Sequence, residues 1–243
     1  MDNIIFSPVG IPLNFHDAYD KVNHWRYTKP NRNYETVVCQ YNDYEPDTNT
    51  YDFIFKKSGY KWDLVKHFLE VFDYNKYEYI GFWDDDLVTD IQSVNRALEI
   101  ATEKNMKMFQ LSTIAGSDST HRILHQRQEL KYSITNFNEG MGQFFHRTMI
   151  PILLEFFQYH EVKSGWGFDL ILSAITKEKC GVIHEVSMYH PGKVSYYDKS
   201  EAFEEMYKIL QDVYPKFMKG YHNEDVGAYS EQQTEYEITF RGI

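Results

Sequence analysis

The chain has 243 residues, a formal net charge of −11, 42% hydrophobic residues and 17% aromatic residues. This length suits one sizeable domain with a hydrophobic core, and the apolar content excludes an intrinsically disordered chain. The negative charge argues against a nucleic-acid backbone or an anionic membrane as the main partner. An acidic protein can still bind a diphosphate if its carboxylates hold a divalent cation that supplies local positive charge.

No apolar run is long enough to predict a transmembrane helix, and the first ten residues lack the pattern of a signal peptide. Cys39 and Cys180 lie far apart in apolar runs, which favours buried free thiols over a disulfide or a zinc site. We therefore expect a cytoplasmic protein. No repeat or linker divides the chain, so we predict one domain over residues 1–220 and a polar C-terminal arm over residues 221–243.

Strands and helices are predicted to alternate along the chain. Apolar runs bounded by Pro, Gly or polar residues predict strands, and apolar residues at helical spacing predict helices. Asp90 is expected to cap a helix, and Pro151 to begin another. Residues 112–135 predict a long irregular loop, and the last helix is expected to bury Phe203, Met206, Leu210 and Val213 on one face. We predict strands over residues 3–10, 35–42, 51–55, 77–83, 106–111, 142–145 and 181–189.

Such alternation predicts an α/β fold with a mostly parallel central sheet and helices on both faces. Ligands bind such sheets beyond the carboxyl ends of the strands. Asp84, Asp85 and Asp86 follow the predicted strand over residues 77–83 and therefore fall at that edge. Three adjacent carboxylates repel one another, and a cation would offset that repulsion. The alternative is a solvated acidic turn that precedes the next helix.

The run Phe82-Trp83-Asp84-Asp85-Asp86-Leu87 resembles the DXD element of GT-A glycosyltransferases. It is also similar to the Trp-Asp-Glu-Asp-Leu run of a family catalogued as a domain of unknown function. Further segments fit that family in order, over about residues 35 to 192: Lys61-Trp62, Asn138-Glu139-Gly140-Met141, Gly165-Trp166-Gly167-Phe168-Asp169, Gly181-Val182-Ile183 and His190.

This resemblance implies a single GT-A domain that binds a nucleotide sugar through a divalent cation. Asp86 would be the direct metal ligand, Asp84 a ribose or secondary contact, and Asp85 could exchange roles with either. His190 would complete the coordination and would favour Mn²⁺ over Mg²⁺. His184 competes for that role, but its place inside an apolar strand favours a core histidine.

The resemblance also implies residues for the two substrates. Trp166 and Gly167 would lie against the acceptor, Glu139 would bind sugar hydroxyls, and Asp169 would accept the proton of the attacking hydroxyl. The competing interpretation is that the glycines and Asp169 merely begin a helix. On the donor side, the strand ends would hold the nucleotide base, and Lys61 is the candidate for the diphosphate, with Lys57 and Arg26 as further basic residues. The strand-end residues are Pro8, Val9, Gly10, Tyr41 and Asn42.

We therefore predict a metal-dependent, inverting glycosyltransferase that moves a hexose or deoxyhexose to the hydroxyl of a glycan or other acceptor. A phosphatase of the haloacid-dehalogenase type is the main alternative, because Asp84 and Asp86 also fit its Asp-x-Asp nucleophile motif. That class needs a late acidic pair, and the strand over residues 181–189 offers only Glu185. A nucleotide-sugar-binding module without catalysis is the second alternative.

Overall fold

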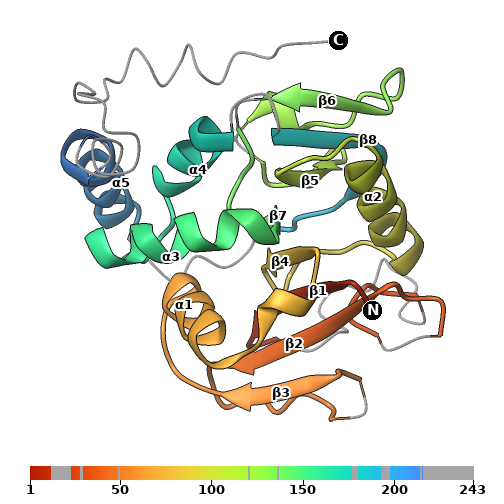
Figure 1. Cartoon of the computed structure of the whole chain (residues 1–243), viewed down its shortest axis with the longest axis horizontal. Helices are drawn as coiled ribbons and strands as arrows, with labels where there is room; N and C mark the ends of the chain where they lie inside the picture. Colours follow the sequence, from red (N-terminus) through yellow and green to blue (C-terminus); the bar gives the residue numbers. More distant parts are fainter. Residues whose placement is uncertain are drawn as a thin grey trace.

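In the computed structural model, the described residues are 1–11, 23–27, 30–48, 50–119, 121–135, 137–176, 180–192, 198–213 and 215. The predicted arm over residues 221–243 lies outside them. The described residues form one eight-stranded sheet in the order β3-β2-β1-β4-β7-β5-β8-β6 (Figure 1). Its strands are β1 (Asn3–Val9), β2 (Tyr34–Gln40), β3 (Phe53–Lys56), β4 (Tyr79–Trp83), β5 (Met108–Thr113), β6 (Tyr132–Thr135), β7 (Gly142–His146) and β8 (Cys180–Met188).

The predicted α/β fold with a mostly parallel sheet is confirmed. Strands β3, β2, β1 and β4 run parallel to one another, as do β5 and β8. Two strands run the other way: β7 lies between β4 and β5, and β6 pairs with β8 at the sheet edge. The helices are α1 (Lys61–Val71), α2 (Ile91–Glu103), α3 (Ile150–Tyr159), α4 (Phe168–Thr176) and α5 (Lys199–Lys208).

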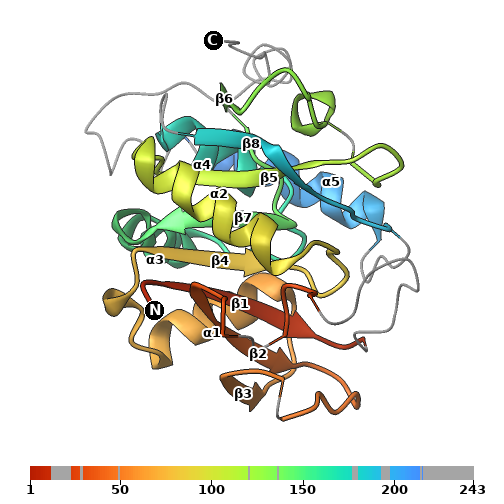
Figure 2. The same cartoon turned by 90° about the vertical axis from the view of Figure 1, so that its right-hand side faces the viewer.

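The sheet separates two hydrophobic clusters, because successive side chains of a strand point to opposite faces. Ile80 and Phe82 of β4 belong to the cluster that contains residues of α1, α3 and α4. Tyr79 and Trp83 belong to the cluster that contains the buried face of α2. Figures 1 and 2 show α2 on one side of the sheet and α1, α3 and α4 on the other. Asp90 caps α2 as predicted, since its side chain accepts a hydrogen bond from the Ser93 N–H at 2.7 Å.

The prediction of an irregular loop over residues 112–135 is wrong at both ends. Strand β5 continues to Thr113, and β6 occupies Tyr132–Thr135. Ser133 and Thr135 are buried in β6, so its sequence lacks the apolar alternation that identifies most strands. Their hydroxyls are satisfied inside the protein: Ser133 Oγ lies 2.9 Å from His184 Nε2, and Thr135 Oγ1 donates to the Phe137 carbonyl at 2.8 Å.

The predicted buried face of the last helix is also wrong in part. Phe203 is 47% exposed, whereas Ala202, Ile209 and Leu210 are buried. After α5 the chain widens into a π-helical turn over Ile209–Val213. Ala202 and Ile209 are seven residues apart, about two turns of an α-helix, so they lie on one face, which is the buried one. Phe203 lies beside that face and packs against Trp166.

Candidate functional site

The acidic triplet lies directly beyond the carboxyl end of β4, as predicted. The Asp84 N–H donates to the Met141 carbonyl at 2.8 Å, which continues the β4–β7 contact by one residue. Val88 and Tyr189 then form an isolated antiparallel bridge, with N–H to carbonyl distances of 2.9 and 2.8 Å. Because Tyr189 immediately precedes His190, this bridge brings the end of β8 against the acidic turn.

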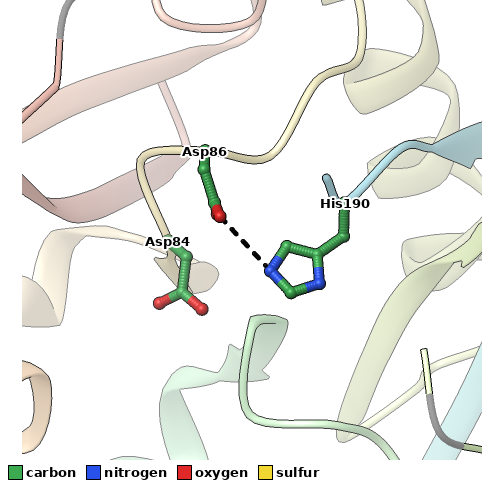
Figure 3. Close-up of side chains that lie close together, drawn as sticks. All are labelled: Asp84, Asp86 and His190. Carbon is green, nitrogen blue, oxygen red and sulfur yellow. Dashed lines mark ion pairs between the residues drawn. The ribbon is translucent and has the colours of Figure 1, made fainter. Parts of the chain in front are cut away.

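Asp84, Asp86 and His190 consequently meet in space (Figure 3). Each offers one ligand atom, and these atoms all lie within 4.8 Å of one another. The closest pair joins His190 Nε2 to Asp86 Oδ2 at 3.4 Å. The side chains of Asp86 and His190 are 15% and 19% exposed, so the cluster is partly shielded but accessible. The resemblance implied Asp86 and His190 as metal ligands, with Asp84 as a ribose or secondary contact.

The chemistry of this cluster fits a divalent cation. Asp86 Oδ1 is buried and has no hydrogen-bond partner among the described residues, and a buried carboxylate oxygen normally has one. His190 Nδ1 lies 2.7 Å from the Asp118 carbonyl, which only accepts, so Nδ1 carries a proton. That contact orients the ring and leaves Nε2 as the nitrogen that can bind a metal. Two carboxylates and an imidazole suit Mn²⁺.

The surroundings of the cluster raise the pKa values of His190 and Asp84. Burial opposes protonation of His190, but the hydrogen bond and the charge of Asp86 outweigh it and raise the pKa of His190 to about 9. Burial also raises the pKa of Asp84, against the opposing charge of Lys61. His190 must release the proton on Nε2 before that nitrogen can bind a metal, so cation binding at this site is expected to release a proton.

Lys61, predicted to contact the diphosphate, forms a hydrogen bond to Asp84, the first residue of the triplet. Its Nζ donates to Asp84 Oδ1 at 2.6 Å, to the Gly140 carbonyl at 2.6 Å and to the Met141 carbonyl at 3.3 Å. An ammonium group has three donors, and these three acceptors use all of them. Lys61 can therefore contact the diphosphate of a nucleotide sugar only if one of these hydrogen bonds breaks. That contact stays a prediction.

The side of the site that was predicted to bind the donor contains the ends of β1 and β2. The Asn42 Nδ2 donates to the Gly10 carbonyl at 3.1 Å, and the Tyr41 ring lies directly against Gly10. The carboxylate of Asp85 accepts from the Gly10 N–H at 2.6 Å. Burial raises the pKa of Asp85 to about 6, although Arg26 lowers it. The structure thus brings together the predicted donor residues Pro8, Val9, Gly10, Tyr41, Asn42 and Asp85.

The side of the site that was predicted to bind the acceptor contains two carboxylates with raised pKa values. Burial is the main reason that the pKa of Asp169 rises to about 8, and the charge of Glu139 adds to that rise. Burial also raises the pKa of Glu139 to about 7, against the opposing influence of His190. Strongly raised pKa values in a polar site are typical of groups that transfer protons. Asp169 lies in the first turn of α4, where the Leu170 N–H donates to its Oδ1 at 2.9 Å.

Packing accounts for the glycines around Trp166. Gly165 and Gly167 have φ values of 84° and 81°, which favour glycine. A Cβ on Gly165 would lie 2.4 Å from Trp62 Nε1, and one on Gly167 would lie 3.1 Å from Met206 Cγ. The Trp166 ring meets Phe203 of α5 edge to face, with centroids 4.9 Å apart. The contact of Trp166 and Gly167 with an acceptor stays a prediction.

Three neighbours of the site were not predicted from the sequence. The Asp118 carbonyl orients His190, the Ser119 hydroxyl donates to Glu139 Oε2 at 3.4 Å, and Gln110 Oε1 accepts from the Glu139 N–H at 2.6 Å. Asp118 and Ser119 lie within residues 112–135, which the sequence predicted as a loop, but no local pattern distinguishes them. His184 is 1% exposed and contacts Ser133, which confirms it as a core histidine.

No protein-family model and no curated protein matches this chain by sequence. Among solved structures, the chain is similar to S. aureus TarS 1-349, with a TM-score of 0.59 and 11% identity, over 98% of this chain and 69% of that one. The complex of TarS 1-349 with UDP-GlcNAc gives a TM-score of 0.59 and 13% identity, over 98% and 70%. A longer TarS structure gives 0.54 and 11%, over 92% of this chain and 43% of that one. At these identities the likeness shows the fold alone, which is GT-A-like.

The part of the chain that the structure describes contains no helix long and apolar enough to cross a membrane.

Proposed function

We propose that this protein is a metal-dependent glycosyltransferase that moves a hexose or deoxyhexose from a nucleoside-diphosphate sugar to a hydroxyl group of an acceptor. The observation that carries this proposal is the convergence of Asp84, Asp86 and His190 beyond the carboxyl end of β4. The ends of β1 and β2 lie beside the same turn, through the contact of Asp85 with Gly10. This arrangement offers adjacent places for a diphosphate and a nucleoside.

The binding roles follow from the contacts of each residue. Asp86 and His190 would hold a Mn²⁺ or Mg²⁺ ion, with Asp84 as the third ligand or as a ribose contact. When bound, the ion supplies positive charge for the diphosphate in a protein with a net charge of −11. Asp118 keeps the His190 ring oriented, and Lys61 holds Asp84 in place. The fold likeness to TarS in complex with UDP-GlcNAc makes a UDP-sugar the first donor to test.

Asp169 is the proposed base. A sugar hydroxyl is a weak nucleophile until a base takes its proton, and such help typically contributes about 10² to 10⁴ in rate. A raised pKa near 8 makes Asp169 a stronger base than an exposed aspartate, provided that it is ionised. Attack on the face opposite the departing diphosphate inverts the anomeric carbon. Glu139 would bind hydroxyl groups of the acceptor beside it.

Thermal unfolding with nucleotide sugars tests the proposal. UDP-GlcNAc at about 100 times its dissociation constant should stabilise the parent protein by about 2.7 kcal/mol with Mn²⁺ present, and much less in EDTA. Asp86→Ala and His190→Ala should remove the Mn²⁺-dependent part of this stabilisation. His125→Ala is the matched control, because His125 is exposed and is not part of the cluster.

The proposal is wrong if a panel of UDP-, GDP- and CDP-sugars gives no Mn²⁺-dependent stabilisation of the parent. Rapid hydrolysis of a phosphomonoester would instead support the phosphatase alternative. Binding of a nucleotide sugar without transfer to any acceptor or to water would support the binding module.

A further inference from the structure

Asp85 makes different contacts from those of Asp84 and Asp86. Its Oδ2 accepts two backbone hydrogen bonds, from the Gly10 N–H at 2.6 Å and from the Ile11 N–H at 3.1 Å. Both donors lie just beyond the end of β1, more than 70 residues away in the chain. Asp85 is absent from the group of ligand atoms formed by its two neighbours and His190. Its carboxylate joins the acidic turn to the end of β1.

Arg26 also joins the acidic turn to the end of β1, and we call this contact region the junction. It is 1% exposed, and its guanidinium donates to the backbone carbonyl of Asp85 at 3.2 Å and to that of Ile11 at 3.4 and 3.5 Å. It also donates to the Tyr51 hydroxyl at 2.7 Å. The guanidinium thus lies between the two segments that the Asp85 carboxylate connects. Because Arg26 is almost fully buried, its contacts serve this junction rather than a diphosphate in solvent.

Gly10 in turn packs against the residues that follow the neighbouring strand, β2. A Cβ on Gly10 would lie 2.3 Å from the Tyr41 ring and 2.5 Å from Asn42 Nδ2. Gly10 therefore packs closely against the side chains of Tyr41 and Asn42, and a shift of Gly10 towards them would displace them. A contact that locates Gly10 therefore also locates the two residues proposed to bind the nucleoside.

We propose that Asp85 is a positioning residue, which holds the nucleoside-binding ends of β1 and β2 at a set distance from the cation ligands. This inference rests on the proposed function, because it takes Gly10, Tyr41 and Asn42 as the nucleoside side of the site. Hydrogen bonds from N–H groups to a carboxylate are about twice as strong as neutral ones. Loss of the charge therefore loosens Gly10 and Ile11 without removing a metal ligand.

The test compares UDP and Mn²⁺ binding in Asp85→Asn and in the parent protein. UDP affinity with Mn²⁺ present, measured by calorimetry, should fall about tenfold, the size expected for loss of one charge-assisted contact. Mn²⁺ affinity without nucleotide, measured by electron paramagnetic resonance, should stay within about twofold of the parent. Glu45→Gln is the matched control, since it removes one charge from an exposed residue of the adjacent loop and should change neither affinity.

Hydrogen exchange and a second variant make the test independent of folding defects. The amides of Gly10 and Ile11 should exchange faster in Asp85→Asn, while those of β5 and β8 stay protected. Gly10→Ala displaces Tyr41 and should weaken UDP binding similarly. The double variant should then lose less than the sum of the two single losses, because both changes disturb one junction.

Two results would overturn the inference. A loss of Mn²⁺ affinity as large as that of Asp86→Ala would make Asp85 a metal ligand. Unchanged UDP affinity and unchanged exchange at Gly10 and Ile11 would show that Asp85 positions nothing. A parent protein that binds none of UDP, GDP and CDP would contradict the proposed function instead. The exchange and Mn²⁺ measurements would then still decide whether Asp85 joins the two segments.

Discussion

The donor and acceptor sides of the candidate site are built from different kinds of contact. On the donor side, the carboxylate of Asp85 is satisfied by backbone N–H groups, and the ammonium of Lys61 by three acceptors. On the acceptor side, Glu139 and Asp169 are carboxylates whose burial raises the pKa of each well above its usual range. Under the proposed function, the first side is preorganised for binding, and the second side keeps carboxylates of raised pKa for proton transfer.

The largest expected effect concerns Asp169. Asp169→Asn keeps the shape of the side chain but removes the basic oxygen, so turnover should fall by about 10² to 10⁴. Mn²⁺-dependent binding of the donor should stay within about twofold, because the donor side does not depend on Asp169. Steady-state rates and calorimetry measure the two quantities. Near-parental turnover, or a product whose anomeric configuration by NMR equals that of the donor, would show that Asp169 is not an inverting base.

The pH dependence of turnover should reflect the same carboxylate. Asp169 acts only when ionised, so kcat should rise with pH up to about 8, the raised pKa of Asp169. Between pH 6 and pH 8 the increase should be about 10- to 100-fold. Glu139→Gln removes a neighbouring negative charge that raises this pKa, so the rise should move to lower pH. A profile that stays flat over this range would contradict the assignment.

The burial of Asp169 should make the free energy of unfolding depend on pH. Because the pKa of Asp169 is raised in the folded protein, the folded state holds this proton more tightly than the unfolded state. The free energy of unfolding therefore decreases as pH rises from about 4 to about 8. Asp169→Asn removes this loss and should be more stable than the parent at pH 8 by about 1–3 kcal/mol, with a smaller gain at pH 5. Urea unfolding at the two pH values measures the difference, and equal gains would contradict it.

The smallest expected effect separates two roles of Trp166. If its ring contacts the acceptor, Trp166→Ala should raise the acceptor KM by about tenfold, whereas Phe203→Ala should leave KM nearly unchanged. If the ring only packs on α5, both variants should lose about 0.5–1.5 kcal/mol of stability with little kinetic change, as for an aromatic pair. Phe203 is the natural control, because it forms the other half of the edge-to-face contact.

Local sequence pattern predicted most of the elements and the position of the acidic triplet in the fold. A buried apolar strand followed by three carboxylates correctly located Asp84 and Asp86 just beyond the carboxyl end of β4, because strand ends can be recognised from neighbouring residues. Asp90 as a helix cap and His184 as a core residue were also predicted from their immediate neighbours. The strand β6 escaped the same reasoning, because it buries polar residues and the hydroxyl of Ser133 is satisfied by a distant partner, His184.

The sequence by itself determined which residues are candidates for the chemistry of the site, whereas the tertiary structure decided which contacts each candidate makes. Asp84, Asp85 and Asp86 are chemically identical, and no local pattern distinguishes them. Their contacts diverge because Asp84 meets Lys61 of α1, Asp85 meets the end of β1, and Asp86 meets the histidine that follows β8. The last two contacts join segments brought together by the strand order β1-β4-β7-β5-β8. Long-range pairing of this kind depends on the packing of the whole sheet, which residues near the triplet do not encode.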